Sequence, residues 1–282
     1  DIELPIPIEN IKIQSVEPIK LTSFLKGMEF KTLTEKKARE FSLTLDEIKN
    51  ENLNLDFKNE KEKSINLKNE IDINKFNYEK YSVVQDLKEL EDWKKNIDEK
   101  GYVAVDTETD SLNAIEANLV GFSMATDINN ACYIPLKHDD SNKQINFEDA
   151  ISILKSIAED KSITKIFHNK KYDALVLDKY GIKVNSYEDT MLISYSLGSG
   201  GTRHGLDNLA KNYLSHSALS YKDIVGTGKN QKSFNEIDIY EATRYAAEDA
   251  DITFRLWKLL KPMLALEKTS SVLFERFSHP MT

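Results

Sequence analysis

The chain has 282 residues, with 38 basic and 47 acidic side chains and a formal net charge of −9. This length is sufficient for one or two domains with cores of their own. No apolar run approaches the roughly 20 residues that cross a bilayer, and the first residues show no pattern of a secretory leader. The single cysteine, Cys132, excludes an internal disulfide framework. The acidic balance disfavours a basic surface for duplex nucleic acid, although bound cations can supply positive charge locally.

The first 80 residues divide into two stretches of different composition. Residues 1–43 begin with alternating proline and isoleucine and then become helical around Ile19 to Phe41. Apolar residues there follow the i, i+3, i+4, i+7 spacing of a helix face, at Leu21, Phe24, Leu25 and Met28. This stretch is too short to enclose a core alone. Residues 44–80 combine dense mixed charge with few aromatic residues, which predicts a solvated linker.

From Tyr81 onward, the spacing of apolar residues predicts a packed domain. Strands are expected at Tyr102–Val105, Leu119–Ala125, Ala131–Leu136 and Ile163–Phe167. Helices are expected at Leu87–Ile97, Phe147–Ala158, about Asn169–Tyr180, Asp189–Leu197, His204–Tyr213 and Ile237–Leu266. The first three strands predict an antiparallel meander, and the later alternation of strand and helix predicts an α/β domain with a mixed sheet.

Acidic residues stand at particular places on these expected elements. Asp106 and Glu108 are two residues apart at the end of the first strand, so their carboxylates project from the same face. Asp173 lies in the first turns of the helix that follows another strand. Asp249 lies four residues after Tyr245, on the same face of the last helix.

Carboxylates without cysteine or histidine partners are the ligands that Mg²⁺ prefers. Two such ions can stabilise the attacking and leaving oxygens when a phosphodiester is cleaved. Taken singly, each acid also has a simpler interpretation as a solvated turn, a helix N-terminal acid or a surface charge. Spacing does not choose between Glu248 and Asp249, since both lie beside Tyr245 on the helix. The order of the acids along the chain and their placement on the elements favour a metal site.

Five collinear segments resemble those of the bacterial DNA polymerase I family, the family A DNA polymerases. Three of these segments resemble the exonuclease motifs of that family in order: Val105–Leu112 the first, His168–Asp173 the second and Tyr245–Asp251 the third. Arg203–Ala210 and Gly228–Gln231 also follow the family, and the match extends from about Tyr81 to Leu266. The resemblance implies a ribonuclease-H-like (DnaQ-like) α/β exonuclease fold, with a mixed five-stranded sheet flanked by helices.

The resemblance also implies an activity and a site. Residues 81–265 would form a proofreading 3′–5′ exonuclease that releases deoxynucleoside monophosphates from single-stranded or frayed 3′ ends of DNA. Two divalent metal ions, Mg²⁺ or Mn²⁺, are implied as cofactors. Asp106, Glu108 and Asp249 would hold one ion, and Asp106 with Asp173 would hold the second. Tyr245 would orient the attacking water.

Four further residues occupy positions where the family contacts the frayed 3′ end. Leu112 would wedge against or stack on a base, and Tyr221 would offer an aromatic face. Asn169 and Arg203 would approach phosphate or sugar. One departure is His168, which stands where relatives often carry glutamine.

The flanks fit the same resemblance. Residues 1–43 resemble the C-terminal end of a 5′-nuclease domain, and residues 266–282 resemble the start of a polymerase domain. Those domains of the full-length chain would be partners, in the bacterial cytoplasm and associated with the nucleoid, and no polymerase activity is expected here. Two alternatives stay open: a catalytically silent DNA-binding or spacer module, and an RNA-directed 3′ exonuclease of the same fold.

Overall fold

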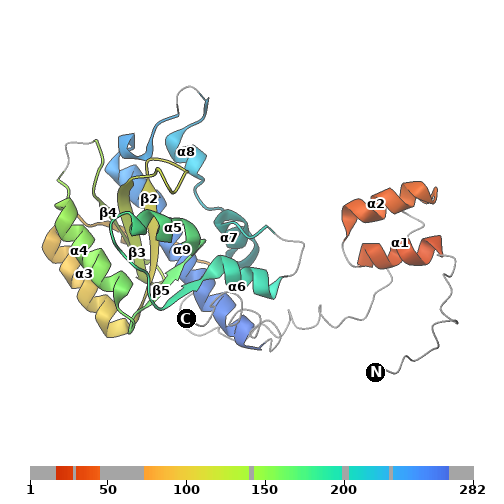
Figure 1. Cartoon of the computed structure of the whole chain (residues 1–282), viewed down its shortest axis with the longest axis horizontal. Coiled ribbons are helices and arrows are strands. Elements are labelled where there is room, and N and C mark those ends of the chain that lie inside the picture. Colours follow the sequence, from red (N-terminus) through yellow and green to blue (C-terminus); the bar gives the residue numbers. More distant parts are fainter. Residues whose placement is uncertain are drawn as a thin grey trace. The chain divides into compact units, whose positions relative to one another are not determined.

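The computed structural model describes residues 17–27, 30–44, 73–139, 143–198, 203–228 and 231–266. These residues form two compact units, which are best considered separately (Figure 1). The first contains helices α1 (Pro18–Gly27) and α2 (Lys31–Glu40), within the stretch expected to be helical. Its origin in a 5′-nuclease domain stays a prediction. Most of the expected linker and the expected start of the polymerase domain lie outside the described residues.

The second unit is built on a mixed sheet with the order β1-β4-β3-β2-β5-β6. Its strands are β1 (Ser82–Val83), β2 (Tyr102–Thr109), β3 (Leu119–Asp127), β4 (Asn130–Pro135), β5 (Thr164–Phe167) and β6 (Tyr187–Asp189). The pairs β2–β3 and β3–β4 are antiparallel, which confirms the meander, whereas β5 and β6 continue the sheet in parallel. The expected fold class is confirmed, but the described sheet has six strands rather than five. The short edge strands β1 and β6 have too few residues to show an apolar alternation.

Except for the short helix α8, which lies in none of the expected ranges, the helices of this unit lie close to those ranges. They are α3 (Leu87–Lys100), α4 (Phe147–Glu159), α5 (Lys170–Asp178), α6 (Thr190–Leu197), α7 (Leu206–Leu214), α8 (Tyr221–Val225) and α9 (Ile239–Leu266). Side chains of Asp86, Asn146 and Asp189 cap the first turns of α3, α4 and α6, which explains where these helices begin. Gly101 ends α3 in the left-handed conformation that favours glycine. No helix in the described part of the chain is long and apolar enough to cross a membrane.

The two faces of the sheet pack against different helices. Val103 and Val105 of β2 belong to the core formed with α3, α4 and α5. Ala104, on the opposite face of the same strand, packs with Ala247 and Phe254 of α9. Because side chains alternate along a strand, the residues of β2 with even numbers face α9.

The first strand is longer than expected. The expected apolar run ended at Val105, directly before Asp106, but β2 continues to Thr109 and remains paired with β3. The acidic residues interrupt the apolar run, so the run alone ends too early. Asp106 and Glu108 are therefore held within the sheet, on the face that packs against α9.

Candidate active site

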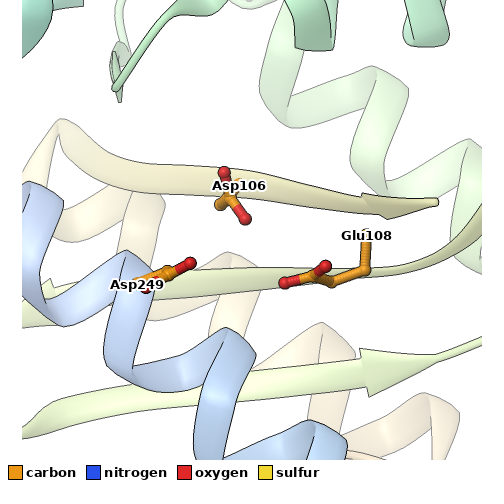
Figure 2. Close-up of side chains that lie close together, drawn as sticks. All are labelled: Asp106, Glu108 and Asp249. Carbon is orange, nitrogen blue, oxygen red and sulfur yellow. The ribbon is translucent and has the colours of Figure 1, made fainter. Parts of the chain in front are cut away.

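Three carboxylates from two elements meet between β2 and α9. Ligand oxygens of Asp106, Glu108 and Asp249 all lie within 4.8 Å of one another. Figure 2 shows Asp249 on its helix with its carboxylate turned toward the two acids of the strand. Glu108 and Asp249 are buried, with 5% and 8% of their surface exposed. The structure thus brings together three of the four acids expected to bind metal.

The structure also distinguishes the two adjacent acids of α9. Asp249 points into the cluster, whereas Glu248 is completely buried on another side of the helix. The carboxylate of Glu248 accepts hydrogen bonds from the Tyr78 hydroxyl at 2.6 Å and the Leu219 N–H at 2.8 Å, and it contacts His216 Nε2 at 2.7 Å. These partners occupy both of its oxygens. Asp249 is therefore the residue of this pair that is available to a ligand.

Asp173 lies beside the three clustered acids and is held in place by Thr107. One oxygen of Asp173 accepts hydrogen bonds from the backbone N–H of Thr107 at 3.1 Å and from its hydroxyl at 2.7 Å. The buried carboxylate of Asp189 fixes the start of α5 by accepting the N–H groups of Asn169 and Lys170, at 3.1 and 2.9 Å. Asp189 caps α6 as well, so one side chain ties two helices together near Asp173.

The four acids have pKa values well above the usual range for carboxyl groups. Burial is the main cause for each, because it penalises the charged form. Neighbouring charges add to this effect: Asp249 raises the pKa of Asp106, and Asp106 raises those of Glu108 and Asp173. These acids repel one another when all are ionised, and a cation between them would remove the repulsion.

One buried atom in this cluster lacks a partner. Glu108 Oε1 is inaccessible to solvent and has no hydrogen bond, although buried polar atoms are normally paired. The donor set consists of carboxylate oxygens alone, which suits a hard divalent cation such as Mg²⁺ or Mn²⁺. The residues present therefore fit the metal that the sequence predicts.

Tyr245 adjoins the acids and remains protonated. Burial, followed by the negative charges of Asp249, Glu108 and Asp106, raises its pKa far above the usual tyrosine range. Its hydroxyl is a neighbour of the Asp249 carboxylate. Aromatic neighbours hold the ring, with the centroid of Phe234 at 6.0 Å and that of Tyr221 at 6.3 Å. A phenol in this state is a hydrogen-bond donor and not a base.

The four residues predicted to contact DNA differ in exposure. Leu112 is 79% exposed in the loop after β2. Asn169 and Arg203 are exposed, and Asn169 adopts the left-handed conformation at the start of α5. Tyr221 is half-buried, and its ring stacks on Phe234 with a centroid distance of 6.3 Å. Their contacts with DNA stay predictions.

Two features near Leu112 were missed in the sequence. Ile115, in the same loop, is a second exposed apolar side chain, with 76% of its surface accessible. The Tyr172 hydroxyl holds the start of this loop by bonding the Ser111 carbonyl and the Thr109 hydroxyl, each at 2.5 Å. The position of Tyr172, immediately before Asp173 in the second motif, is the signal that would have identified it.

The surroundings of His168 keep its imidazole neutral. Its Nδ1 lies 2.8 Å from the Thr190 hydroxyl, while its Nε2 is buried without a partner. Burial lowers its pKa to about 4, against a smaller opposing effect of the Asp189 charge. His168 is thus a neutral ring packed behind the start of α5.

Comparison with known proteins identifies the family. The model of the 3′–5′ exonuclease domain of family A DNA polymerases matches residues 81–265. The chain belongs to this exonuclease family. DNA polymerase I of Rhizobium leguminosarum is 43% identical over 225 residues, which cover 73% of this chain and 22% of that protein. The chain therefore spans about a fifth of the length of such curated relatives.

Solved structures support the ribonuclease-H-like fold of this exonuclease family. The POL domain of Pol1 from M. smegmatis is similar with a TM-score of 0.52 and 19% identity, over 68% of this chain and 29% of that one. Brucella melitensis NrnC is similar with a TM-score of 0.50 and 23% identity, over 72% of this chain and 88% of that one. At these identities the similarity concerns the fold, and the expected fold is confirmed.

Proposed function

We propose that this chain is the proofreading part of a DNA polymerase I and hydrolyses phosphodiester bonds at the 3′ end of DNA, releasing deoxynucleoside monophosphates. The observation that carries the proposal is the meeting of Asp106, Glu108 and Asp249 within 4.8 Å, with a buried oxygen of Glu108 left unpaired. Membership of the exonuclease family supports the same reaction.

Two divalent ions are the proposed cofactors. Asp106, Glu108 and Asp249 would hold one, and Asp106 with Asp173 would hold the other. Such ions stabilise charge on the scissile phosphate and make water a better nucleophile. Asp173 suits its role because Thr107 engages only one of its oxygens in the described structure, which leaves the other for a ligand.

The remaining chemistry depends on side chains around the acids. The protonated hydroxyl of Tyr245 can orient a water molecule through a hydrogen bond while the carboxylates hold the proton that this water gives up. The water oxygen bonds to phosphorus, and the 3′ oxygen of the preceding nucleotide leaves with a proton. Leu112, an exposed apolar side chain, suits contact with the terminal base.

The substrate proposed is a single-stranded or frayed 3′ end. The polymerase and 5′-nuclease domains of a longer chain are the proposed partners, in the cytoplasm at the bacterial nucleoid. The names of the relatives support this context, since they are DNA polymerases I of which this chain spans about a fifth.

The decisive test is degradation of a 5′-labelled primer with a mismatched 3′ end, in Mg²⁺ or Mn²⁺ and in a chelator. We expect shortening from the 3′ end that the chelator and Asp106→Ala both abolish. Asp98→Ala, which removes an exposed acid of α3, is the matched control and should retain activity.

The same assay separates the alternatives. Preferential shortening of an RNA oligonucleotide would favour the RNA-directed exonuclease. Absence of both shortening and metal uptake, in folded protein, would favour the silent module. Full activity of Asp106→Ala in a clean preparation would contradict the assignment of the acids.

A further inference from the structure

We propose that Glu248 and Asp251 act as positioning residues that set the rotation of α9 and thereby the placement of Asp249. Both accept hydrogen bonds from the segment of residues 73–81. This inference rests on the proposed function, because it concerns the same metal-binding acids. It assigns a role to residues 73–80, which precede the part of the chain that the family model matches.

Helical geometry separates α9 into two polar faces. Each residue advances by about 100° around the axis, so Tyr245 lies about 40° from Asp249, on the face of the acidic cluster. Glu248, Asp251 and Arg255 lie about 200–260° around from Asp249. We call these three residues the back face of α9. All three are completely buried, with 0% of their surface exposed.

The segment of residues 73–81 binds the back face at both ends. The Tyr78 hydroxyl donates to Glu248 at 2.6 Å, and the Tyr81 hydroxyl donates to Asp251 at 2.7 Å. The Arg255 guanidinium donates to the carbonyl of Ile73 at 2.5 Å. These contacts extend over eight residues of helix, from Glu248 to Arg255, which is about 10 Å along its axis, and Asp249 lies within this length.

The turn between β3 and β4 completes this network. The backbone N–H of Asn129 donates to Asp251 at 3.1 Å, and Asn129 Oδ1 accepts from Arg255 at 2.7 Å and from the N–H of Asn77 at 2.7 Å. Arg255 also pairs with Asp251 at 2.9 Å, and its guanidinium lies 3.8 Å from the centroid of the Phe76 ring. The back face is thus tied to the sheet as well as to the segment.

Glu248 connects the same helix to the chain between α7 and α8. Its carboxylate contacts His216 Nε2 at 2.7 Å and accepts the N–H of Leu219 at 2.8 Å. The His216 ring stacks on Phe76 with centroids 3.6 Å apart. Burial and the bond to Glu248 raise the pKa of Tyr78 to about 12, which keeps its hydroxyl a donor.

These bonds supply what apolar packing lacks. The contact between α9 and the sheet is formed largely by alanines, and apolar burial has no preferred direction. Hydrogen bonds to carboxylates are directional and are lost when the helix rotates or slides. Displacement of a catalytic group by about 1 Å can reduce the rate about 100-fold. The hydrogen bonds on the back face of α9 therefore affect the position of Asp249 on the face of the acidic cluster.

The experiment uses the whole chain and two variants of the network. Glu248→Gln retains the shape of the side chain but removes an acceptor, and Tyr81→Phe removes one hydroxyl. The matched control is Thr126→Val, since Thr126 is also completely buried and bonds Asn96 and Asn130 away from α9. For each protein we would measure the Kd for Mn²⁺ by electron paramagnetic resonance, kcat and KM on single-stranded DNA, and the thermal midpoint.

We expect Glu248→Gln to weaken Mn²⁺ binding and to lower kcat about 10- to 100-fold, with KM for DNA changed less than about two-fold. Excess Mn²⁺ should restore part of kcat, because the defect lies in the placement of a metal ligand. Tyr81→Phe should change the same quantities in the same direction by less. Thr126→Val should lower only the thermal midpoint.

Variants that match Thr126→Val in Mn²⁺ affinity and kcat would overturn the inference and leave the proposed function intact. If Glu248→Gln fails to fold, Tyr81→Phe decides by the same criterion. A wild-type chain that neither binds Mn²⁺ nor shortens DNA would instead contradict the proposed function, and the positioning role would fall with it.

Discussion

His168 shows how one residue can couple the second motif to pH. Its ring is neutral in the folded protein because burial lowers its pKa to about 4, whereas an exposed histidine titrates near 6.5. Between these values the unfolded chain binds more protons than the folded one. Folding stability is therefore lost as the pH falls from about 6.5 to about 4, and it is retained above this window.

We expect His168→Gln to reduce this loss. Glutamine does not titrate, so the variant should lose up to about 3 kcal/mol less stability than the wild type between these pH values. Denaturant unfolding at several pH values measures the difference. Equal pH dependence of the two proteins would show that His168 is protonated in the fold without penalty.

The adjacent acids of α9, Glu248 and Asp249, are a pair of residues whose roles the sequence alone does not distinguish. Spacing places both Glu248 and Asp249 beside Tyr245, and only contacts with residues distant in the chain distinguish them. Glu248 accepts a hydrogen bond from Tyr78, which is 170 residues away, while Asp249 lies in the cluster with Asp106 and Glu108. A sequence pattern records the residue types but not which partner reaches a side chain.

Among the elements, β3 leaves no room for a side chain opposite Glu108. Gly121 pairs with Glu108, and a Cβ atom at Gly121 would lie 2.2 Å from the Tyr133 hydroxyl and 2.7 Å from the carbonyl of Ile134. Real Cβ contacts are not this short, so any side chain there must displace the neighbouring strand. The glycine is required by this close approach.

Gly121→Ala should therefore destabilise the domain by about 1–3 kcal/mol, the usual effect of overpacking. Activity should fall as well, because β3, which lies between the displaced β4 and Glu108 of β2, would shift with it. Gly205→Ala is the matched control, since its added Cβ would approach no closer than 3.6 Å to Asn208. Thermal unfolding and primer shortening measure both effects. A Gly121→Ala protein as stable as the control would mean that β3 and β4 adjust freely.

Element types were predictable where a segment carries its own periodicity. The meander and the helices from α3 to α9 were found with boundaries a few residues in error, apart from the five-residue α8. The strands β1 and β6 were missed because two or three residues show no pattern of their own. Residues 73–80 resemble a linker in composition, and their role depends on buried contacts with α9 that composition does not record.

For the molecule as a whole, the acidic cluster that suits metal binding also destabilises the fold, because its buried carboxylates repel one another. The chain carries a net charge of −9, and the cluster concentrates part of that charge in a buried site. The order of the motifs can be read from one sequence, and it predicted the family and the four acids. The raised pKa values could not be predicted in this way, because they depend on how completely the fold removes these groups from water.

Without metal, this repulsion should make stability depend on pH. The folded pKa values of the four acids are raised above those of the unfolded chain, so the contribution of these acids to stability is greatest at low pH and is lost as the pH rises through the folded values. In a chelator, we expect the thermal midpoint to fall as the pH rises above the usual range of carboxyl pKa values. Saturating Mg²⁺ should remove most of this fall, because binding to the folded state stabilises it.

Asp249→Asn should separate the two effects. The amide removes one charge from the cluster, so in a chelator at about pH 8.5 the variant should melt a few degrees higher than the wild type. Mg²⁺ should then add little to its midpoint, and primer shortening should be lost. Glu241→Gln, an exposed acid at the start of α9, is the control and should change neither quantity. An Asp249→Asn protein that melts lower than the wild type in a chelator would mean that the favourable contact of Asp249 with Tyr245 outweighs the repulsion from Asp106 and Glu108.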